Sequence, residues 1–224
     1  MAQIELINLT KIYTVGAEQL PATQDVSLVI DKGEFLTFVG HSGSGKTTLI
    51  SMIGGILRPT SGKVLFEGND IFALDDDGLS EFRNKNIGFM FQFASLLPIL
   101  TAMENVLLPG VFSQKPLTYN SEKAQRYLEL VGLGDKYDAY PSQLSGGQQR
   151  RVAIARGLIN EPDVILADEP TGDLDEETEA EIMSLFGKIN QEKKVTIILI
   201  THNLELAKQG NKIMRMTKGV LVNE

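Results

Sequence analysis

One short stretch constrains the fold of this chain more than any other feature: residues 40–47, which read Gly-His-Ser-Gly-Ser-Gly-Lys-Thr. They match the pattern G-x-x-x-x-G-K-[ST] at every fixed position. An apolar run of strand type, residues 36–39, precedes them, and a helical pattern follows Gly45. The stretch therefore predicts a strand, a tight loop and a helix, a unit typical of α/β proteins with a parallel sheet.

The residue types in this loop suit a phosphate. Glycines allow consecutive backbone N–H groups to turn toward one anion, and the start of the following helix adds positive potential. Lys46 would reach the β- and γ-phosphates of a nucleotide, and the Thr47 hydroxyl would hold Mg²⁺. The alternative is a Gly-Ser turn that only happens to precede a lysine, and the flanking strand and helix disfavour it. The expected nucleotide-binding residues are Gly40, His41, Ser42, Gly43, Ser44, Gly45, Lys46, Thr47 and Thr48.

Composition narrows the classes of protein further. The chain has 224 residues, of which 42% are hydrophobic, enough for one large α/β domain or two small ones with ample material for a core. The formal net charge of −8 argues against a nucleic-acid backbone as the main partner. The absence of cysteine excludes disulfides and thiolate metal sites. We expect no secretion signal, and apolar runs such as residues 195–200 are too short to span a bilayer.

The first hundred residues have the pattern of an antiparallel sheet packed beside a nucleotide-binding core. Strands are expected at residues 4–9, 26–30 and 64–66, and a turn at residues 11–16. Residues 75–78 are read as a solvated loop or a helix start.

From residue 101 onward the pattern becomes helical, beginning with a capping box. Three prolines are expected to interrupt the helices: Pro109, Pro116 and Pro141. We interpret residues 101–158, approximately, as a helical subdomain inserted into a core made of residues 1–100 and 159–224. All three parts would belong to a single domain, residues 1–224.

A second motif follows an apolar strand pattern at residues 164–167. Asp168 and Glu169 come directly after it, at the end of a strand where α/β sheets place their ligands. Because successive strand side chains diverge, the two acids should have different roles. Asp168 would face Mg²⁺, directly or through water, and Glu169 would act on the attacking water as general base. Acidic pairs also occur in ordinary turns, but the phosphate loop upstream favours the catalytic interpretation.

A third motif is Leu-Ser-Gly-Gly-Gln at residues 144–148. It distinguishes one family among the many proteins that have both the phosphate loop and the acidic pair. A Ser-Gly-Gly turn that opens a helix can bind an anion, although it can equally be a simple helix cap. With the three motifs together, the chain resembles the ATP-binding cassette (ABC) ATPases over essentially its whole length. The resemblance implies an α/β P-loop NTPase core with a parallel sheet, an N-terminal antiparallel β subdomain and an inserted helical subdomain.

The resemblance also implies partners and cofactors. Two cassettes would face each other head to tail as a homodimer, with each ATP and its Mg²⁺ between the phosphate loop of one subunit and the signature turn of the other. The chain would work with an integral membrane permease, in the cytoplasm at the inner face of the cell membrane, and would bind no nucleic acid. The signature residues would be Ser145, Gly146, Gly147 and Gln148.

Further positions match the family one by one. Tyr13 would stack on adenine, although an ordinary edge aromatic would look the same. Gln92, at the end of an expected strand, would contact Mg²⁺ and water and sense the membrane partner, and His202 would reach the γ-phosphate. Residues 171–175 would cross the dimer interface, where Asp173 stands in place of a more common Asn. The implied catalytic residues are Glu169, His202 and Gln92, and the implied Mg²⁺ ligands are Thr47, Gln92 and Asp168.

Within the family, residues 91–98, 104–106 and 166–172 resemble the branch for lipoprotein release, macrolide and peptide efflux and cell division (the LolD, MacB and FtsE types). Phe93 departs from a glutamine that many of these relatives carry. The resemblance thus implies an ATP-hydrolysing subunit whose dimer closure powers a separate permease in export or lipoprotein release.

Other classes compete with this interpretation. A soluble or non-transport ABC ATPase remains the main alternative, either in mechanical signalling during cell division or linked to DNA. A DNA-linked ATPase would need a long coiled coil between Gln92 and Leu144, which are only 52 residues apart. A phosphotransferase would not need the signature motif, a translation-type factor would carry two cassettes, and a pure binding module would not need Glu169.

Overall fold

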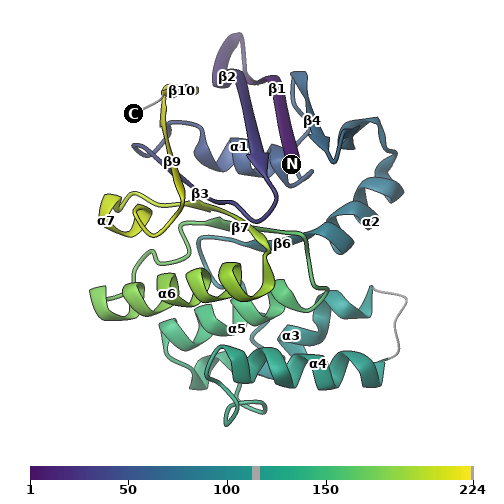
Figure 1. Cartoon of the computed structure of the whole chain (residues 1–224), viewed down its shortest axis with the longest axis vertical. Helices are drawn as coiled ribbons and strands as arrows, with labels where there is room; N and C mark the ends of the chain where they lie inside the picture. Colours follow the sequence, from purple (N-terminus) through teal and green to yellow (C-terminus); the bar gives the residue numbers. More distant parts are fainter. Residues whose placement is uncertain (113–116, 223–224) are drawn as a thin grey trace.

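The computed structural model describes residues 1–112 and 117–222, which form two sheets with helices on both sides of the larger one (Figure 1). The strands are β1 (Ala2–Val15), β2 (Glu18–Asp31), β3 (Phe35–Val39), β4 (Ser61–Phe66), β5 (Asn69–Asp70), β6 (Ile87–Met90), β7 (Val164–Asp168), β8 (Thr196–Ile200), β9 (Lys212–Thr217) and β10 (Val220–Val222). The helices are α1 (Lys46–Ile53), α2 (Asp76–Asn86), α3 (Ala102–Val111), α4 (Leu117–Leu130), α5 (Gly146–Leu158), α6 (Glu176–Lys193) and α7 (Leu204–Ala207).

The larger sheet has six strands in the order β10-β9-β3-β8-β7-β6. Its strands run parallel except for β10, which pairs antiparallel with β9. Every residue of β3, β7 and β8 is buried, as expected for a parallel sheet covered on both faces. Alternate side chains enter two cores: Ile165 packs on the side of α3–α6, and Leu166 packs on the side of α1.

The smaller sheet is antiparallel, with the order β2-β1-β4-β5, and it lies with α1 on one side of the larger sheet (Figure 1). The turn predicted at residues 11–16 is wrong, because β1 continues to Val15 and the chain reverses only at Gly16 and Ala17. The second strand is also longer than predicted and contains Pro21. Since β2 is an edge strand, a proline there removes no hydrogen bond that the sheet needs.

The prolines of the helical region behave differently from one another. The break predicted at Pro109 is wrong: Pro109 lies inside α3, two residues before the helix ends, so its missing N–H affects only the last turn. The Pro109 carbonyl accepts a hydrogen bond from Asn160 Nδ2 at 3.3 Å. Pro116 lies outside the described residues, whereas Pro141 opens a short 3₁₀ turn between α4 and α5, as an interruption there predicts.

Two helix starts follow from local chemistry. The capping box at residue 101 is confirmed, since Thr101 and Glu104 bond each other's backbone N–H groups. Asp75 accepts from the backbone N–H of Gly78 at 2.8 Å, so residues 75–78 are a helix start rather than a loop. Across residues 1–112 and 117–222, no helix has both the length and the apolar character needed to cross a membrane.

The sheet topology positions the site. Parallel strands end at the same edge, so the ends of β3, β6, β7 and β8 deliver their following residues to one place. These residues are the phosphate loop after β3, Gln92 after β6, Asp168 and Glu169 at the end of β7, and His202 after β8.

Candidate nucleotide-binding and hydrolysis site

The phosphate loop is shaped by two glycines whose backbone no other residue would adopt easily. Gly40 has φ +150° and Gly45 has φ +102°. A Cβ at Gly40 would overlap the carbonyl oxygen of Met216, and a Cβ at Gly45 would overlap that of Ala22. Gly45 precedes α1 and no side chain caps that helix, so the N-terminus of α1 is left to bind an anion.

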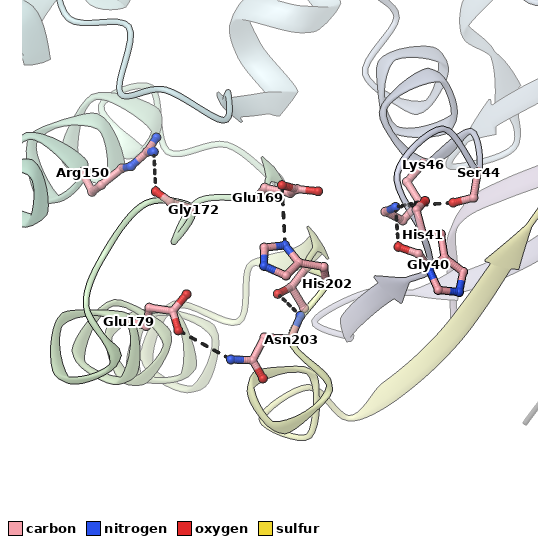
Figure 2. A network of polar contacts seen from close by, with 11 residues as sticks. Gly40, His41, Ser44, Lys46, Arg150, Glu169, Gly172, Glu179, His202 and Asn203 are labelled. Carbon is pink, nitrogen blue, oxygen red and sulfur yellow. Dashed lines mark hydrogen bonds and ion pairs between the residues drawn. The ribbon is translucent and has the colours of Figure 1, made fainter.

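Lys46 lies inside this loop, with only 5% of the residue exposed. Its Nζ donates to the carbonyl oxygens of Gly40 at 2.8 Å and His41 at 2.9 Å, and to Ser44 Oγ at 3.4 Å (Figure 2). Burial lowers the pKa of Lys46, while the nearby carboxylates of Glu169 and Asp168 oppose that shift. The ammonium thus lies within the phosphate loop and is bonded to loop oxygens.

Asp168 ends β7 and is 8% exposed. Burial raises the pKa of its carboxyl group, and the negative charge of Glu169 raises it further. A hydrogen bond from Thr47 and the positive charge of Lys46 act in the opposite direction and lower this pKa. Thr47 and Asp168 therefore bring a hydroxyl and a carboxylate oxygen together. Oxygen ligands with one carboxylate are what Mg²⁺ prefers when it also binds phosphates.

Glu169 and His202 face each other across the ends of β7 and β8 (Figure 2). His202 Nδ1 lies 3.7 Å from Glu169 Oε2. Glu169 adopts a left-handed backbone, φ 46°, which costs about 1–2 kcal/mol in a residue with a Cβ. The backbone N–H of Glu169 donates to the Ile200 carbonyl at 3.0 Å, and this bond holds the turn in place. Such strain is often found at functional sites.

Two of the predicted site residues, Gln92 and Tyr13, are more exposed than Lys46 and Asp168. Gln92 is exposed in the loop after β6, and across the described part of the chain its side chain makes no hydrogen bond. Tyr13 is 41% exposed and has Lys11 Nζ 5.5 Å from its ring. It pairs with Leu20 of β2, two residues before Ala22, whose carbonyl adjoins the phosphate loop. Tyr13 is therefore on the hairpin beside that loop, where an adenine ring could reach it.

The signature turn, residues 144–148, is a capped helix start. Ser145 Oγ accepts from the N–H of Gln148 at 3.2 Å, and Gln148 Oε1 accepts from the N–H of Ser145 at 3.0 Å. Gly147 lies against Thr178, and Gly146 lies beside Leu174. The helix α5 that starts here packs on the opposite face of the large sheet from α1. The helix-cap interpretation is thus correct in geometry, and it leaves Gly146 and Ser145 exposed.

One buried residue beside the site is missing from the predicted set. Arg150 of α5 is 5% exposed, and its guanidinium bonds backbone carbonyls of two site loops. The signal in the sequence is helical periodicity: Arg150 shares a face of α5 with Gly147 and Ile154, which are both buried.

Comparison with known proteins agrees with this geometry. The family model for the ABC transporter matches residues 23–172. The chain therefore belongs to the ABC transporter family, and it is an ATP-binding and ATP-hydrolysing cassette of that family. This bears out the family predicted from the three motifs.

Particular relatives extend the match. An uncharacterized ABC transporter ATP-binding protein of Thermotoga maritima is 48% identical, over 96% of this chain and 92% of that protein. The macrolide export ATP-binding/permease protein MacB of Rhodopirellula baltica is 43% identical over 99% of this chain, which spans about a third of MacB's length (33%). A dimeric post-hydrolysis structure of the cassette MJ0796, bound to ADP and Pi, has a TM-score of 0.90 at 41% identity, covering 98% and 97% of the two chains. The predicted fold class is confirmed.

Proposed function

We propose that two copies of this chain bind two ATP molecules between them, and that closure and reopening of this dimer drive a separate membrane permease. The observation that supports this proposal most is the position of the two anion-binding helix starts. The helices α1 and α5 lie on opposite faces of the larger sheet. One chain cannot bring both to the same ATP, whereas a second copy arranged head to tail can. The dimeric state of MJ0796 supports the arrangement.

Within each composite site, residues of one copy would hold the triphosphate. The N-terminus of α1 and Lys46 would bind the phosphates, and Tyr13 would cover the adenine. Thr47, Asp168 and Gln92 have the oxygen ligands that fit Mg²⁺, which would neutralise charge on the β- and γ-phosphates. Ser145, Gly146, Gly147 and Gln148 of the other copy would close the site with their N–H groups and hydroxyl.

Glu169 would take the proton from the attacking water. Its carboxylate is 25% exposed, beside the Lys46 ammonium and 3.7 Å from His202 Nδ1. His202 would then lie where the γ-phosphate ends and hold it in line with the water. Both roles depend on the turn that the Glu169 N–H fixes against β8.

The free energy needed to close such a dimer is moderate. Shifting a pair from 1:99 open to 99:1 closed takes about 5.5 kcal/mol of differential binding. Each of two buried ATP molecules therefore needs to contribute roughly half of that amount. Hydrolysis removes the γ-phosphate contacts and reverses the preference.

The permease would lie at the membrane, with this chain on its cytoplasmic face. We assign residues 101–158, approximately, to a helical subdomain that transmits closure to the permease, and residues 1–100 and 159–224 to the core. Identity to MacB supports export as the direction of transport.

Replacement of Glu169 by Gln tests the role of this residue. We expect Glu169→Gln to retain ATP affinity and to slow turnover on the order of 10²–10⁴-fold, because the general base is lost. Glu192→Gln is the matched control, since Glu192 is exposed on the same chain in α6, away from β7. Turnover of Glu169→Gln within a few-fold of the parent would exclude Glu169 as the base.

Transport is tested separately by capture. Tagged Glu169→Gln protein, loaded with ATP and Mg²⁺, would be recovered from solubilised membranes of its own host. A permease with few spanning helices and a large external domain is the expected companion. Recovery of the cassette alone, or with soluble proteins only, would contradict the transport role and favour a non-transport ABC ATPase.

A further inference from the structure

Arg150 connects three parts of the site that are far apart in sequence. Its Nη2 donates to the Gly172 carbonyl at 3.1 Å (Figure 2), and its Nη1 donates to the Phe91 carbonyl at 3.4 Å. Phe91 directly precedes Gln92, and Gly172 lies between Glu169 and Asp173. Arg150 itself lies one turn into α5, after the signature turn. A single side chain thus ties α5 to the loop of the proposed Mg²⁺ ligand and to the loop that follows the proposed base.

Burial of a guanidinium costs desolvation free energy, which indicates that its hydrogen bonds to the two loops have a role. Arg150 is almost fully buried, and burial lowers its pKa, while the Asp173 carboxylate acts in the opposite direction. Asp173 has a left-handed backbone, φ 64°, directly after the carbonyl that Arg150 binds. The hydrogen bond from Arg150 to the Gly172 carbonyl therefore depends on the conformation of residues 172–173.

A second arginine of α5 holds the other side of Gln92. Arg156 donates from Nη1 to the Ser95 carbonyl at 2.8 Å and from Nη2 to the Ala94 carbonyl at 2.8 Å. The segment that carries Gln92 is thus fixed to α5 before and after that residue. A displacement of α5 would move this segment with it. The reason is that a guanidinium group is planar and rigid, so its N–H donors keep fixed directions toward the carbonyls that they bind.

We propose that Arg150 is a positioning residue for ATP hydrolysis, which fixes Gln92 and the loop after Glu169 at one place on α5. The inference rests on the proposed roles of Glu169 and Gln92. Arg150 touches neither nucleotide nor water in this account, and acts only through the backbone carbonyls that it binds.

The test compares two neighbouring arginines of the same helix. Arg150→Gln removes the two contacts, and we expect kcat for ATP to fall about tenfold, with KM and the nucleotide Kd unchanged within twofold, because misplaced catalytic groups slow chemistry more than binding. Arg151→Gln is the matched control. It removes the same charge, but its guanidinium binds Val131 and Glu181, away from both loops, so its kcat should stay within twofold of the parent.

Stability is separated from positioning in two ways. All assays are run well below the lowest Tm among the variants. Arg150→Lys keeps the charge and can reach one carbonyl, so its kcat should be at least threefold higher than that of Arg150→Gln. A kcat for Arg150→Gln within twofold of the parent, or an equal fall in Arg151→Gln, would overturn the proposal. The parent protein in the same assay tests the proposed function separately, since an inactive parent would refute hydrolysis itself.

Discussion

Gly45→Ala is expected to destabilise the phosphate loop far more than Gly43→Ala, although both replace a glycine in the same loop. At Gly45 two costs combine. The left-handed φ of +102° costs a residue with a Cβ roughly 1–3 kcal/mol, and the overlap with the Ala22 carbonyl forces a shift that costs a further 1–3 kcal/mol, roughly. At Gly43 the φ of +77° costs about 1–2 kcal/mol, and nothing lies within 4 Å of the added Cβ.

These values translate into melting temperatures. At about 2–4 °C per kcal/mol for a chain of this size, the central values are a fall in Tm of about 12 °C for Gly45→Ala and about 5 °C for Gly43→Ala. Thermal unfolding of the nucleotide-free proteins, followed by circular dichroism, measures both. Gly45→Ala should also lose most ATP affinity in a fluorescent-nucleotide titration. Equal falls in Tm would refute the argument that the Ala22 carbonyl excludes a side chain at residue 45.

Two further predictions follow from the charges of the site. Lys46→Ala should weaken ATP binding roughly 10- to 150-fold, the loss of one charge-assisted contact of about 1.5–3 kcal/mol, and an unchanged Kd in calorimetry would refute the role of Lys46. Asp168 has a raised pKa, so the folded state binds its proton more tightly than the unfolded state does; stability should therefore fall as pH rises through the range just above 3.8. Asp168→Asn should remove that part of the slope in nucleotide-free unfolding measured against pH, and identical slopes for the two proteins would contradict the assignment.

Motifs that depend on local backbone chemistry were predictable from the sequence. The phosphate loop needs glycine at positions 40 and 45 for conformational reasons, and these reasons are readable without a structure. The acidic pair at the end of β7 was equally predictable, because a run of buried apolar residues ends there. The sheet order that brings His202 to 3.7 Å from Glu169 follows from neither motif alone.

Features decided by tertiary contacts were not predictable. Pro21 suggests the end of a strand, but its position at a sheet edge makes it harmless, and the edge is known only once the sheet is assembled. Pro109 lies so close to the end of α3 that it interrupts nothing. Arg150 was missed because its partners lie in two other loops, 59 and 22 residues away, where no sequence spacing indicates a contact.

The most direct test of ATP-driven dimer closure is the mass of Glu169→Gln in solution, measured by light scattering with and without ATP and Mg²⁺. We expect a 24.6 kDa species without nucleotide and a species of twice that mass with ATP. Ser145→Arg in the same background should bind ATP with unchanged Kd but remain at 24.6 kDa, because the signature turn of the second copy is blocked. A Glu169→Gln protein that stays at 24.6 kDa while saturated with ATP would contradict the claim that two copies close around the nucleotide.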